Sequence, residues 1–250
     1  MVVALILLTN DDGIEAEGLR TLEQSLQGLA DVVVVAPDRE RSAVSHGLTI
    51  HTPLDLQNAG PERYVLVNGT PADCVIFALT QICQRRPDLV ISGINRGANL
   101  GDDVMYSGTV AAAREASRHG IASLAVSQAF SDSKISFDKG SRFARSLARI
   151  MLEQRSNGGV CLNVNIPPKK IRGVRITRQG CSTHFPHFNS LGGGEHFAAL
   201  SQDHRLKSEI PVDYQAIVDN FISITPLQRD QTDYTTIPSL AEVASLFEVP

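Results

Sequence analysis

The sequence predicts an α/β fold: a doubly wound, mostly parallel sheet followed by an extended C-terminal hairpin or arm. Short apolar runs such as Val2–Leu8 and Asp31–Ala36 are typical of strands that are buried on both faces. They alternate with segments whose apolar residues recur at helical spacing, and this alternation predicts parallel strands joined by right-handed crossovers. Residues 180–215 break the alternation, so we expect them to form the arm.

The amino-terminal elements alternate between strand and helix. The strand Val2–Leu8 ends at a polar turn, and after Gly13 the apolar residues recur every three or four positions, as Ile14, Leu19, Leu22, Leu26 and Leu29. A second strand, Asp31–Ala36, ends at Pro37, and the polar segment 38–46 is expected to be a loop. Two extended segments follow at 48–56 and 64–67, divided by Asn58-Ala59-Gly60-Pro61.

A capping signal begins the next helix. Thr70 has the chemistry of an N-cap, Pro71 suits the first helical position and Asp73 suits the third. The helix is expected to end near Gln84, because two arginines and a proline then interrupt the pattern. Further along, we expect strands at 89–92, 122–127 and 160–166, and helices at 109–119 and 137–153.

The chain is expected to divide into a core of residues 1–170 and a C-terminal segment of residues 171–250. Within the second part, strands are predicted at 172–177 and 221–227, and a terminal helix capped by Ser239 at 239–247. Residues 180–215 show little apolar periodicity and are too long for a passive loop inside a compact domain. We therefore expect them to contact another subunit.

Composition excludes several classes of protein. The 250 residues are 42% hydrophobic and 20% charged, which is ordinary for a globular protein. The net charge of −4 gives no general attraction to a nucleic acid duplex or an anionic membrane, and no apolar stretch is long enough to span a bilayer. The four cysteines form no C-x-x-C pair, so we expect a reduced, cytoplasmic location.

Two adjacent carboxylates, Asp11 and Asp12, follow directly on the first strand. They are expected at the carboxyl end of a parallel strand, the edge at which open α/β sheets bind ligands. A dinucleotide-binding protein would have glycines there, so that its backbone could approach a pyrophosphate. Two negative charges would instead repel a phosphate unless a cation stood between them. The turn therefore predicts a hard divalent metal.

A second polar constellation is expected at the same edge. Residues 92–101 follow a strand and combine glycines at 93, 97 and 101 with Asn95 and Asn99. Farther on, Ser107-Gly108-Thr109 leads into the strong helix former Val110-Ala111-Ala112-Ala113. The free N–H groups and the dipole of such a helix start favour an anion. An acidic turn for a cation and a helix start for an anion together predict a phosphate-ester site.

The sequence resembles the stationary-phase survival protein (SurE) family of 5'-nucleotidases in five stretches: LLTNDDGIEAEGL, VVAPDRERSAVS, VNGTPADCV, PDLVISGINRGANLGDDVMYSGTVAAAREA and FISITPL. The similarity runs from Leu7 to about Val126 and resumes between Asp213 and Leu227. The resemblance implies a Rossmann-like core and a homodimer or homotetramer built through the C-terminal arm and an exchanged terminal segment.

The resemblance also implies an activity and a set of site residues. The implied enzyme is a metal-dependent phosphohydrolase that converts nucleoside 5'-monophosphates to nucleoside and phosphate, often acting on 3'-nucleotides and polyphosphate as well. Its metal ligands correspond to Asp11, Asp12, Ser42 and Asn95, and its phosphate contacts to Asn99, Ser107, Gly108 and Thr109. The sequence departs from the family pattern at Ala43, where glycine is frequent, and throughout 180–210.

The implied ligands are all hard oxygen donors, which suit one Mg²⁺ or Mn²⁺ and suit zinc poorly. A bound cation would polarise the phosphoryl oxygens and acidify a water molecule. Asp11 and Asp12 are thus the candidate catalytic residues, Asp11 to align or deprotonate the water and Asp12 mainly as a ligand. Direct attack by the Asp11 carboxylate is the alternative.

Other functions remain open from sequence alone. A sensory module could bind a nucleotide or phosphate through the same loops without hydrolysing it. A purely structural oligomerisation protein would account for the arm and leave the acidic turn unexplained. A haloacid-dehalogenase-type phosphatase also begins with aspartates at a strand end, but that chemistry requires D-x-D spacing, and here Asp11 and Asp12 are adjacent.

Overall fold

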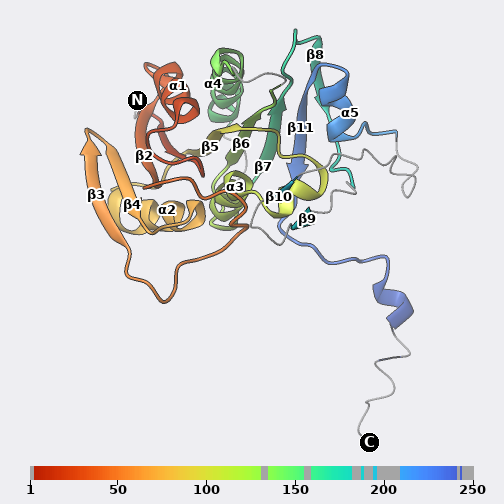
Figure 1. Cartoon of the computed structure of the whole chain (residues 1–250), viewed down its shortest axis with the longest axis horizontal. Coiled ribbons are helices and arrows are strands. Elements are labelled where there is room, and N and C mark those ends of the chain that lie inside the picture. The colour runs from red at the N-terminus through yellow and green to blue at the C-terminus, as the bar shows by residue number, and fades with distance from the viewer. Residues whose placement is uncertain are drawn as a thin grey trace, which may run out of the picture.

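A computed structural model describes residues 3–130, 135–154, 159–181, 187–188, 194–195, 209–240 and 243 (Figure 1). Its main sheet has nine strands in the order β3-β4-β2-β1-β5-β6-β7-β11-β8. Their bounds are β1 Leu5–Thr9, β2 Asp31–Pro37, β3 Asp55–Gly60, β4 Arg63–Val67, β5 Leu89–Arg96, β6 Ser123–Gln128, β7 Cys161–Ile166, β8 Gly173–Ile176 and β11 Phe221–Leu227.

Most neighbouring strands run parallel, as predicted. β4, β2, β1, β5, β6 and β7 form one parallel set, β3 is antiparallel to β4, and β11 is antiparallel to β7 while parallel to β8. The chain passes from β1 outward to β2 on one side and later to β5 on the other. The topological switch point of this doubly wound sheet therefore lies between the carboxyl ends of β1 and β5, where such folds form a ligand crevice.

Helices cover both faces of the sheet (Figure 1). α1 (Glu17–Leu26) and α4 (Asp138–Glu153) lie on one face, and α2 (Pro71–Phe77) and α3 (Gly108–Arg118) lie on the other. The strand β1 contributes to both cores because successive side chains point to opposite faces. Ile6 and Leu8 pack in the cluster with Leu22, whereas Leu7 packs in the cluster with Val75.

Shorter helices lie between these elements. α2 begins with a capping box formed by the Thr70 hydroxyl and the Asp73 carboxylate. The π-helical turn η1 (Ala78–Ile82) continues it. A 3₁₀ helix, η2 (Gly101–Met105), precedes α3, and α5 (Asp213–Val218) precedes β11.

Several element boundaries differ from the sequence-based expectation. The expected strand at 48–56 begins only at Asp55, and β3 continues through Asn58 to Gly60 instead of ending there. A register shift at that point bends the β3–β4 hairpin. β5 extends to Arg96, and α5 was not predicted.

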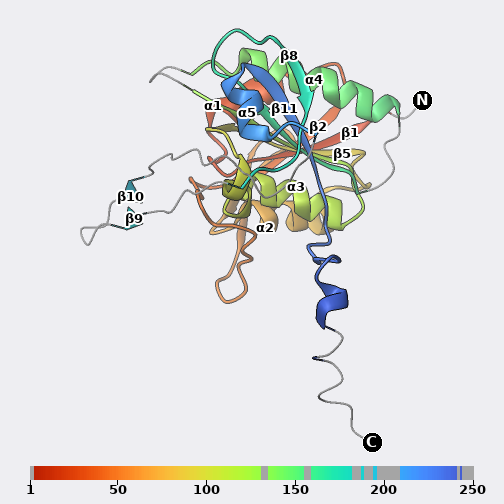
Figure 2. The same cartoon turned by 90° about the vertical axis from the view of Figure 1, so that its right-hand side faces the viewer.

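The C-terminal region leaves the body of the protein. Within the predicted arm, β9 (His187–Phe188) and β10 (Gly194–Glu195) pair antiparallel. After β11 the chain extends away from the sheet (Figures 1 and 2) and carries the exposed side chains of Tyr234, Ile237 and Leu240. A 3₁₀ helix, η3, spans Ile237–Leu240, and most of the helix predicted at 239–247 lies outside the described residues.

No helix among the described residues is long and apolar enough to cross a membrane. Cys74, Cys83, Cys161 and Cys181 are all free thiols. Burial raises the pKa of the Cys161 thiol to about 11, so this sulfur is protonated at neutral pH.

Candidate active site

The candidate site lies at the carboxyl edge of the parallel strands, which faces the viewer in Figure 1. Thr9 at the end of β1 is in register with Ser92 of β5, so the segments that follow these positions emerge side by side. Asp11 and Asp12 follow β1, Asn95 belongs to the end of β5, and Ser107 caps the nearby helix α3. The structure therefore gathers residues that are far apart in the sequence at the switch point.

Asp11 binds directly to the start of α3. Only 5% of the residue is exposed, and its Oδ2 accepts a hydrogen bond from the Thr109 N–H at 3.0 Å. The Thr109 hydroxyl donates to Oδ1 of the same carboxylate. Burial raises the pKa of Asp11, and the bonds from Thr109 oppose that rise. Asp11 thus occupies part of the helix terminus that the sequence suggested for a phosphate.

Gly108 makes this contact possible. A Cβ atom at position 108 would lie 2.9 Å from the Asp11 Cβ and 3.0 Å from its Oδ2, closer than side chains tolerate. Ser107 caps the helix, since its hydroxyl accepts from the Val110 N–H at 3.1 Å. The N–H of Gly108, at the first helical position, has no intrahelical acceptor. The acidic turn and the helix start are therefore in contact.

Asp12 lies beside Asp11 and is half-buried. Its Oδ2 accepts from the Arg96 N–H at 3.3 Å. Burial, followed by the charge of Asp11, raises the pKa of Asp12 to about 6. The ion pairs formed by described basic residues involve neither of these two carboxylates. Glu40 adds to the negative charge around the turn, and the charge of Arg96 partly offsets it at Asp12.

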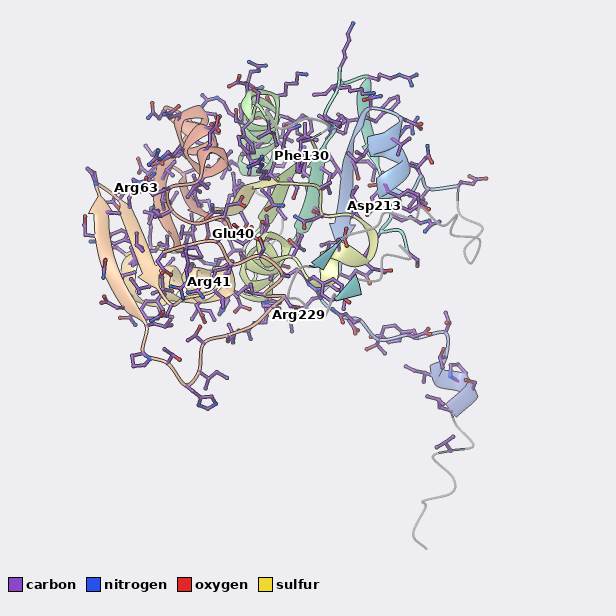
Figure 3. All side chains as sticks on the ribbon, viewed as in Figure 1. Glu40, Arg41, Arg63, Phe130, Asp213 and Arg229 are labelled. Atoms are coloured by element: carbon purple, nitrogen blue, oxygen red, sulfur yellow. The ribbon has the colours of Figure 1, made fainter. Side chains whose placement is uncertain are left out.

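Ser42 belongs to a loop that is tied to the acidic turn. The Arg41 N–H donates to the Asp11 carbonyl at 2.7 Å, which places the loop against the end of β1. The Ser42 side chain is exposed, and its hydroxyl donates to Glu40 Oε1 at 2.6 Å. Figure 3 shows Glu40 and Arg41 near the centre of the carboxyl edge. Ser42 thus lies near the carboxylates, with its proton directed at a neighbouring acid.

Asn95 is half-buried at the end of β5. Its Nδ2 donates to the Gly97 carbonyl at 3.0 Å. The amide oxygen is consequently the atom of this side chain that has the right chemistry for a cation.

Asn99 lies in a buried polar network. Its Nδ2 donates to Ser127 Oγ at 2.8 Å, and its own N–H donates to Asn165 Oδ1 at 2.8 Å. Its carbonyl accepts from the side chains of Asn163 at 2.9 Å and Asn165 at 3.0 Å. These contacts fix the path of the glycine-rich loop. A phosphate contact by the Asn99 side chain stays a prediction.

Asp213 holds the other end of that loop (Figure 3). Its carboxylate is fully buried and accepts from the N–H groups of Gly101 at 2.9 Å and Gly180 at 3.1 Å. Burial raises the pKa of Asp213, and these backbone bonds oppose the rise. The roles of Asp213, Asn163 and Asn165 were not predicted. The asparagines in the otherwise apolar run Cys161–Ile166 were the available signal.

The predicted ligands have the chemistry that suits a hard divalent cation. Asp11 and Asp12 supply carboxylate oxygens, Ser42 a hydroxyl and Asn95 an amide oxygen. In the part of the chain that the structure describes, no group of three or more His, Cys, Asp or Glu side chains is arranged to hold a metal. Neutral oxygens must therefore complete such a site. The unpaired negative charge of the turn is what a cation would neutralise.

Comparisons with known proteins converge on one family. The family model described as "Survival protein SurE" matches residues 6–185. A Moorella thermoacetica protein named "5'-nucleotidase SurE" is 43% identical, with 96% of each chain covered. A Geobacter metallireducens protein of the same name is 41% identical over 94% of this chain and 95% of its own. The crystal structure of the SurE protein from Aquifex aeolicus superposes with a TM-score of 0.82 at 36% identity, covering 96% of this chain and 99% of that one.

Proposed function

The chain belongs to the survival protein SurE family, and on this premise we propose that it is a metal-dependent 5'-nucleotidase that converts nucleoside 5'-monophosphates to nucleoside and phosphate. The observation that carries the proposal is the contact between Asp11 and the start of α3. It sets a cluster of hard oxygen ligands against a helix terminus, so a cation and a phosphoryl group can be held side by side.

Asp11, Asp12, Ser42 and Asn95 would hold the cation, and Mg²⁺ or Mn²⁺ suits their oxygens. When bound, a divalent ion supplies Lewis acidity toward a phosphoryl oxygen and lowers the pKa of a water molecule. The protein supplies the positions: β1 carries the two carboxylates, β5 carries Asn95, and the bond from the Arg41 N–H to the Asp11 carbonyl holds the loop of Ser42.

The start of α3 would bind the phosphoryl group. The Gly108 N–H is at the first helical position, where it has no intrahelical acceptor, and the Ser107 hydroxyl can donate while its oxygen accepts from Val110. Both donors of Thr109 are engaged by Asp11, so its contribution is to hold that carboxylate.

Asp11 would accept the proton of the attacking water. Both of its oxygens already accept hydrogen bonds from Thr109, which fixes its orientation and reduces its strength as a nucleophile. This geometry favours attack by water over attack by the carboxylate itself.

Further properties belong to the same proposal. Activity on 3'-nucleotides and short polyphosphate is expected to accompany the main reaction. The exposed apolar side chains of the tail, which include Tyr234, Ile237 and Leu240, support assembly into a homodimer or homotetramer. The four free thiols support a cytoplasmic location.

The test is phosphate release from AMP after the purified protein has been dialysed against EDTA. We expect little release until Mg²⁺ or Mn²⁺ is restored, and a severe loss in Asp12→Asn. Asp55→Asn, an exposed acid on β3, is the matched control and should retain full activity. Absence of phosphate release in the presence of metal would refute the proposal. Metal-dependent AMP binding by calorimetry without product would instead indicate a sensory module.

A further inference from the structure

Phe130 is a large apolar side chain in an unexpected place. It follows β6, whose residues Ser123–Gln128 are all buried, yet 49% of its own surface is exposed. Figure 3 shows it at the carboxyl edge, the same edge as the candidate site. An exposed aromatic ring beside a ligand crevice offers a flat apolar surface to a ligand.

The Phe130 ring and the proposed metal ligand Asn95 lie on either side of one residue, Gly97. A Cβ atom on Gly97 would lie 3.8 Å from the Asn95 Nδ2 and 3.9 Å from Phe130 Cε1. Gly97 has φ +125°, a conformation that favours glycine, and its N–H donates to the Gln128 carbonyl at 3.0 Å. The glycine-rich loop and the end of β6 are thereby locked together. The ring is close to the ligand cluster without being part of it.

Arg96 adds a cation to the same surface. Its guanidinium lies 5.7 Å from the centroid of the Phe130 ring, within the range of a cation–π contact. The N–H of the same residue binds Asp12. One short segment therefore links the acidic turn to a surface formed by an aromatic ring and a guanidinium, the two groups on which proteins stack nucleobases.

Resting on the proposed function, we infer that Phe130, flanked by Arg96, is the stacking surface for the base of the nucleoside monophosphate. A 5'-nucleotide carries its base on the far side of the ribose from the phosphate. With the phosphate at the start of α3, a base that extends past the proposed metal ligand Asn95 reaches Phe130, because Asn95 and Phe130 both lie next to Gly97. Stacking on a ring tolerates every base, because each base has a π face. The enzyme should therefore accept all four nucleotides and bind purines more tightly.

The first test compares AMP with ribose 5-phosphate, which has the same sugar and phosphate and no base. Phe130→Ala should raise KM for AMP about five- to tenfold, within the usual loss for removing a base-stacking ring. KM for ribose 5-phosphate should stay within about twofold of wild type. Val174→Ala, which truncates a similarly exposed apolar side chain on β8, should change neither value. Melting temperatures of the variants identify any general loss of folding.

A spectroscopic test does not depend on turnover. The chain contains no tryptophan, so Phe130→Trp introduces a single indole at the proposed surface. In an Asp11→Asn background with Mg²⁺, AMP should quench the indole emission in a saturable way and ribose 5-phosphate should not. Phe130→Trp alone should keep KM for AMP at or below the wild-type value, because a larger ring stacks at least as well.

Distinct outcomes separate this inference from the proposed function. Equal changes of KM for both substrates in Phe130→Ala, or no change for either, would overturn the stacking role. Tyr106, which precedes Ser107, is another exposed aromatic residue. The stacking role of Phe130 would also be overturned if Tyr106→Ala raised KM for AMP but not for ribose 5-phosphate, while Phe130→Ala raised neither. If wild-type protein released phosphate from neither compound, the nucleotidase assignment itself would fail.

Discussion

Asp11 combines two properties that usually conflict in a folded protein. It is buried, and it carries a charge that no described basic side chain pairs with. The two hydrogen bonds from Thr109 and the positive end of α3 offset part of the cost of that burial. The remainder of that cost raises the pKa of Asp11, and a bound cation would offset it by favouring the ionised carboxylate.

We therefore predict that Asp11→Asn loses activity without losing stability. Asparagine has almost the same shape and can still accept from Thr109, but it carries no charge and is a poor proton acceptor. Turnover of AMP should fall by a factor of about 100 or more, which is the range that a positioned general base contributes. The melting temperature without metal should stay the same or rise, since an uncompensated buried charge is removed.

Phosphate release and thermal unfolding in EDTA are the two measurements required. A variant that melts several degrees below wild type, or whose circular dichroism spectrum collapses, would show that Asp11 has a structural role in place of the catalytic one. The Asp55→Asn control should match wild type in both measurements, because that residue is exposed on β3.

The sequence predicted where the candidate residues lie in the fold better than it predicted their contacts. Asp11, Asp12 and Asn95 gather at one edge because parallel strands end together, and strands are readable from apolar runs. The direct contact of Asp11 with Thr109 was not foreseen. It depends on the close approach allowed by Gly108, which the packing of α3 against β5 and β6 determines.

β7 is the element that holds the glycine-rich loop in place. Its residues Asn163 and Asn165 are fully buried and both donate to the Asn99 carbonyl, and Asn165 also accepts from the Asn99 N–H. Asn165 thus pairs with the backbone of residue 99 as a neighbouring strand would. The loop that carries Asn95 at its start is fastened to the sheet by side chains.

We predict that Asn165→Leu is more harmful than Asn163→Leu. The first substitution removes both bonds of residue 165 and leaves the Asn99 N–H buried without an acceptor, at a cost of about 1–3 kcal/mol. The second leaves the Asn99 carbonyl with its bond from Asn165 and also removes the Asn163 oxygen, which has no described partner. Activity on AMP should fall in the same order, because Asn95 and Gly97 belong to the loop.

Urea unfolding at one protein concentration and kcat/KM for AMP measure the two effects. The inverse order of stability would show that Asn163 is the main support. Equal activity in both variants, with stability lost in Asn165→Leu alone, would separate the loop from the reaction.

Elements were predicted wherever the pattern was long. α1, α3 and α4 have an apolar face that repeats over several turns, and β1 and β2 contain continuous apolar runs. α5 spans only six residues, too few for a periodic signal, and follows a polar stretch. The bounds predicted for β3 were wrong because Asp55, Asn58 and Gly60 are residues typical of turns, and this segment becomes a strand by pairing with β4.

At the scale of the whole molecule, Glu115 joins segments that lie far apart in the chain. Its side chain is 3% exposed and accepts from Arg118 at 2.7 Å. It also pairs with His46 at 2.9 Å, from the loop that carries Ser42, and with His119 at 3.1 Å. Burial alone would raise the pKa of Glu115. The bonds from His46 and Arg118 outweigh it and lower that pKa from 4.5 to about 2.

This pKa predicts how stability depends on pH. Because folding lowers the pKa of Glu115, the stabilisation from its ionised form is complete above the unfolded value of about 4.5. It is lost as the pH falls from about 4.5 to about 2. Glu115→Gln should therefore lower the free energy of unfolding at pH 7 by about 1–3 kcal/mol, and its difference from wild type should shrink below pH 4.5.

Urea unfolding at pH 7, 5 and 3 measures that difference. Glu153→Gln is the matched control, because its exposed pair with Arg149 at 3.9 Å should contribute almost nothing at any pH. If the difference in free energy of unfolding between Glu115→Gln and wild type were the same at pH 3 as at pH 7, the stabilising role of the Glu115 charge would be contradicted.

For the molecule as a whole, the sequence predicted the type of sheet but not the complete order of its strands. Alternating strands and helices fix a doubly wound α/β arrangement, and the acidic turn then falls at the switch point. The C-terminal strands were predicted but their pairing was not: β11 runs antiparallel to β7 and parallel to β8. Strand order depends on long-range pairing energies that no local pattern contains.

The position of β11 has a consequence for the protein while it is being made. Every proposed ligand, from Asp11 to Thr109, has left the ribosome long before residue 221 is translated, yet β8 has no neighbour in the sheet until β11 arrives. Until then one edge of β7 is an open row of backbone donors and acceptors. A nascent chain halted before Phe221 would hold the whole crevice and still offer that edge to other nascent chains. The pairing of β11 with β7 closes that edge.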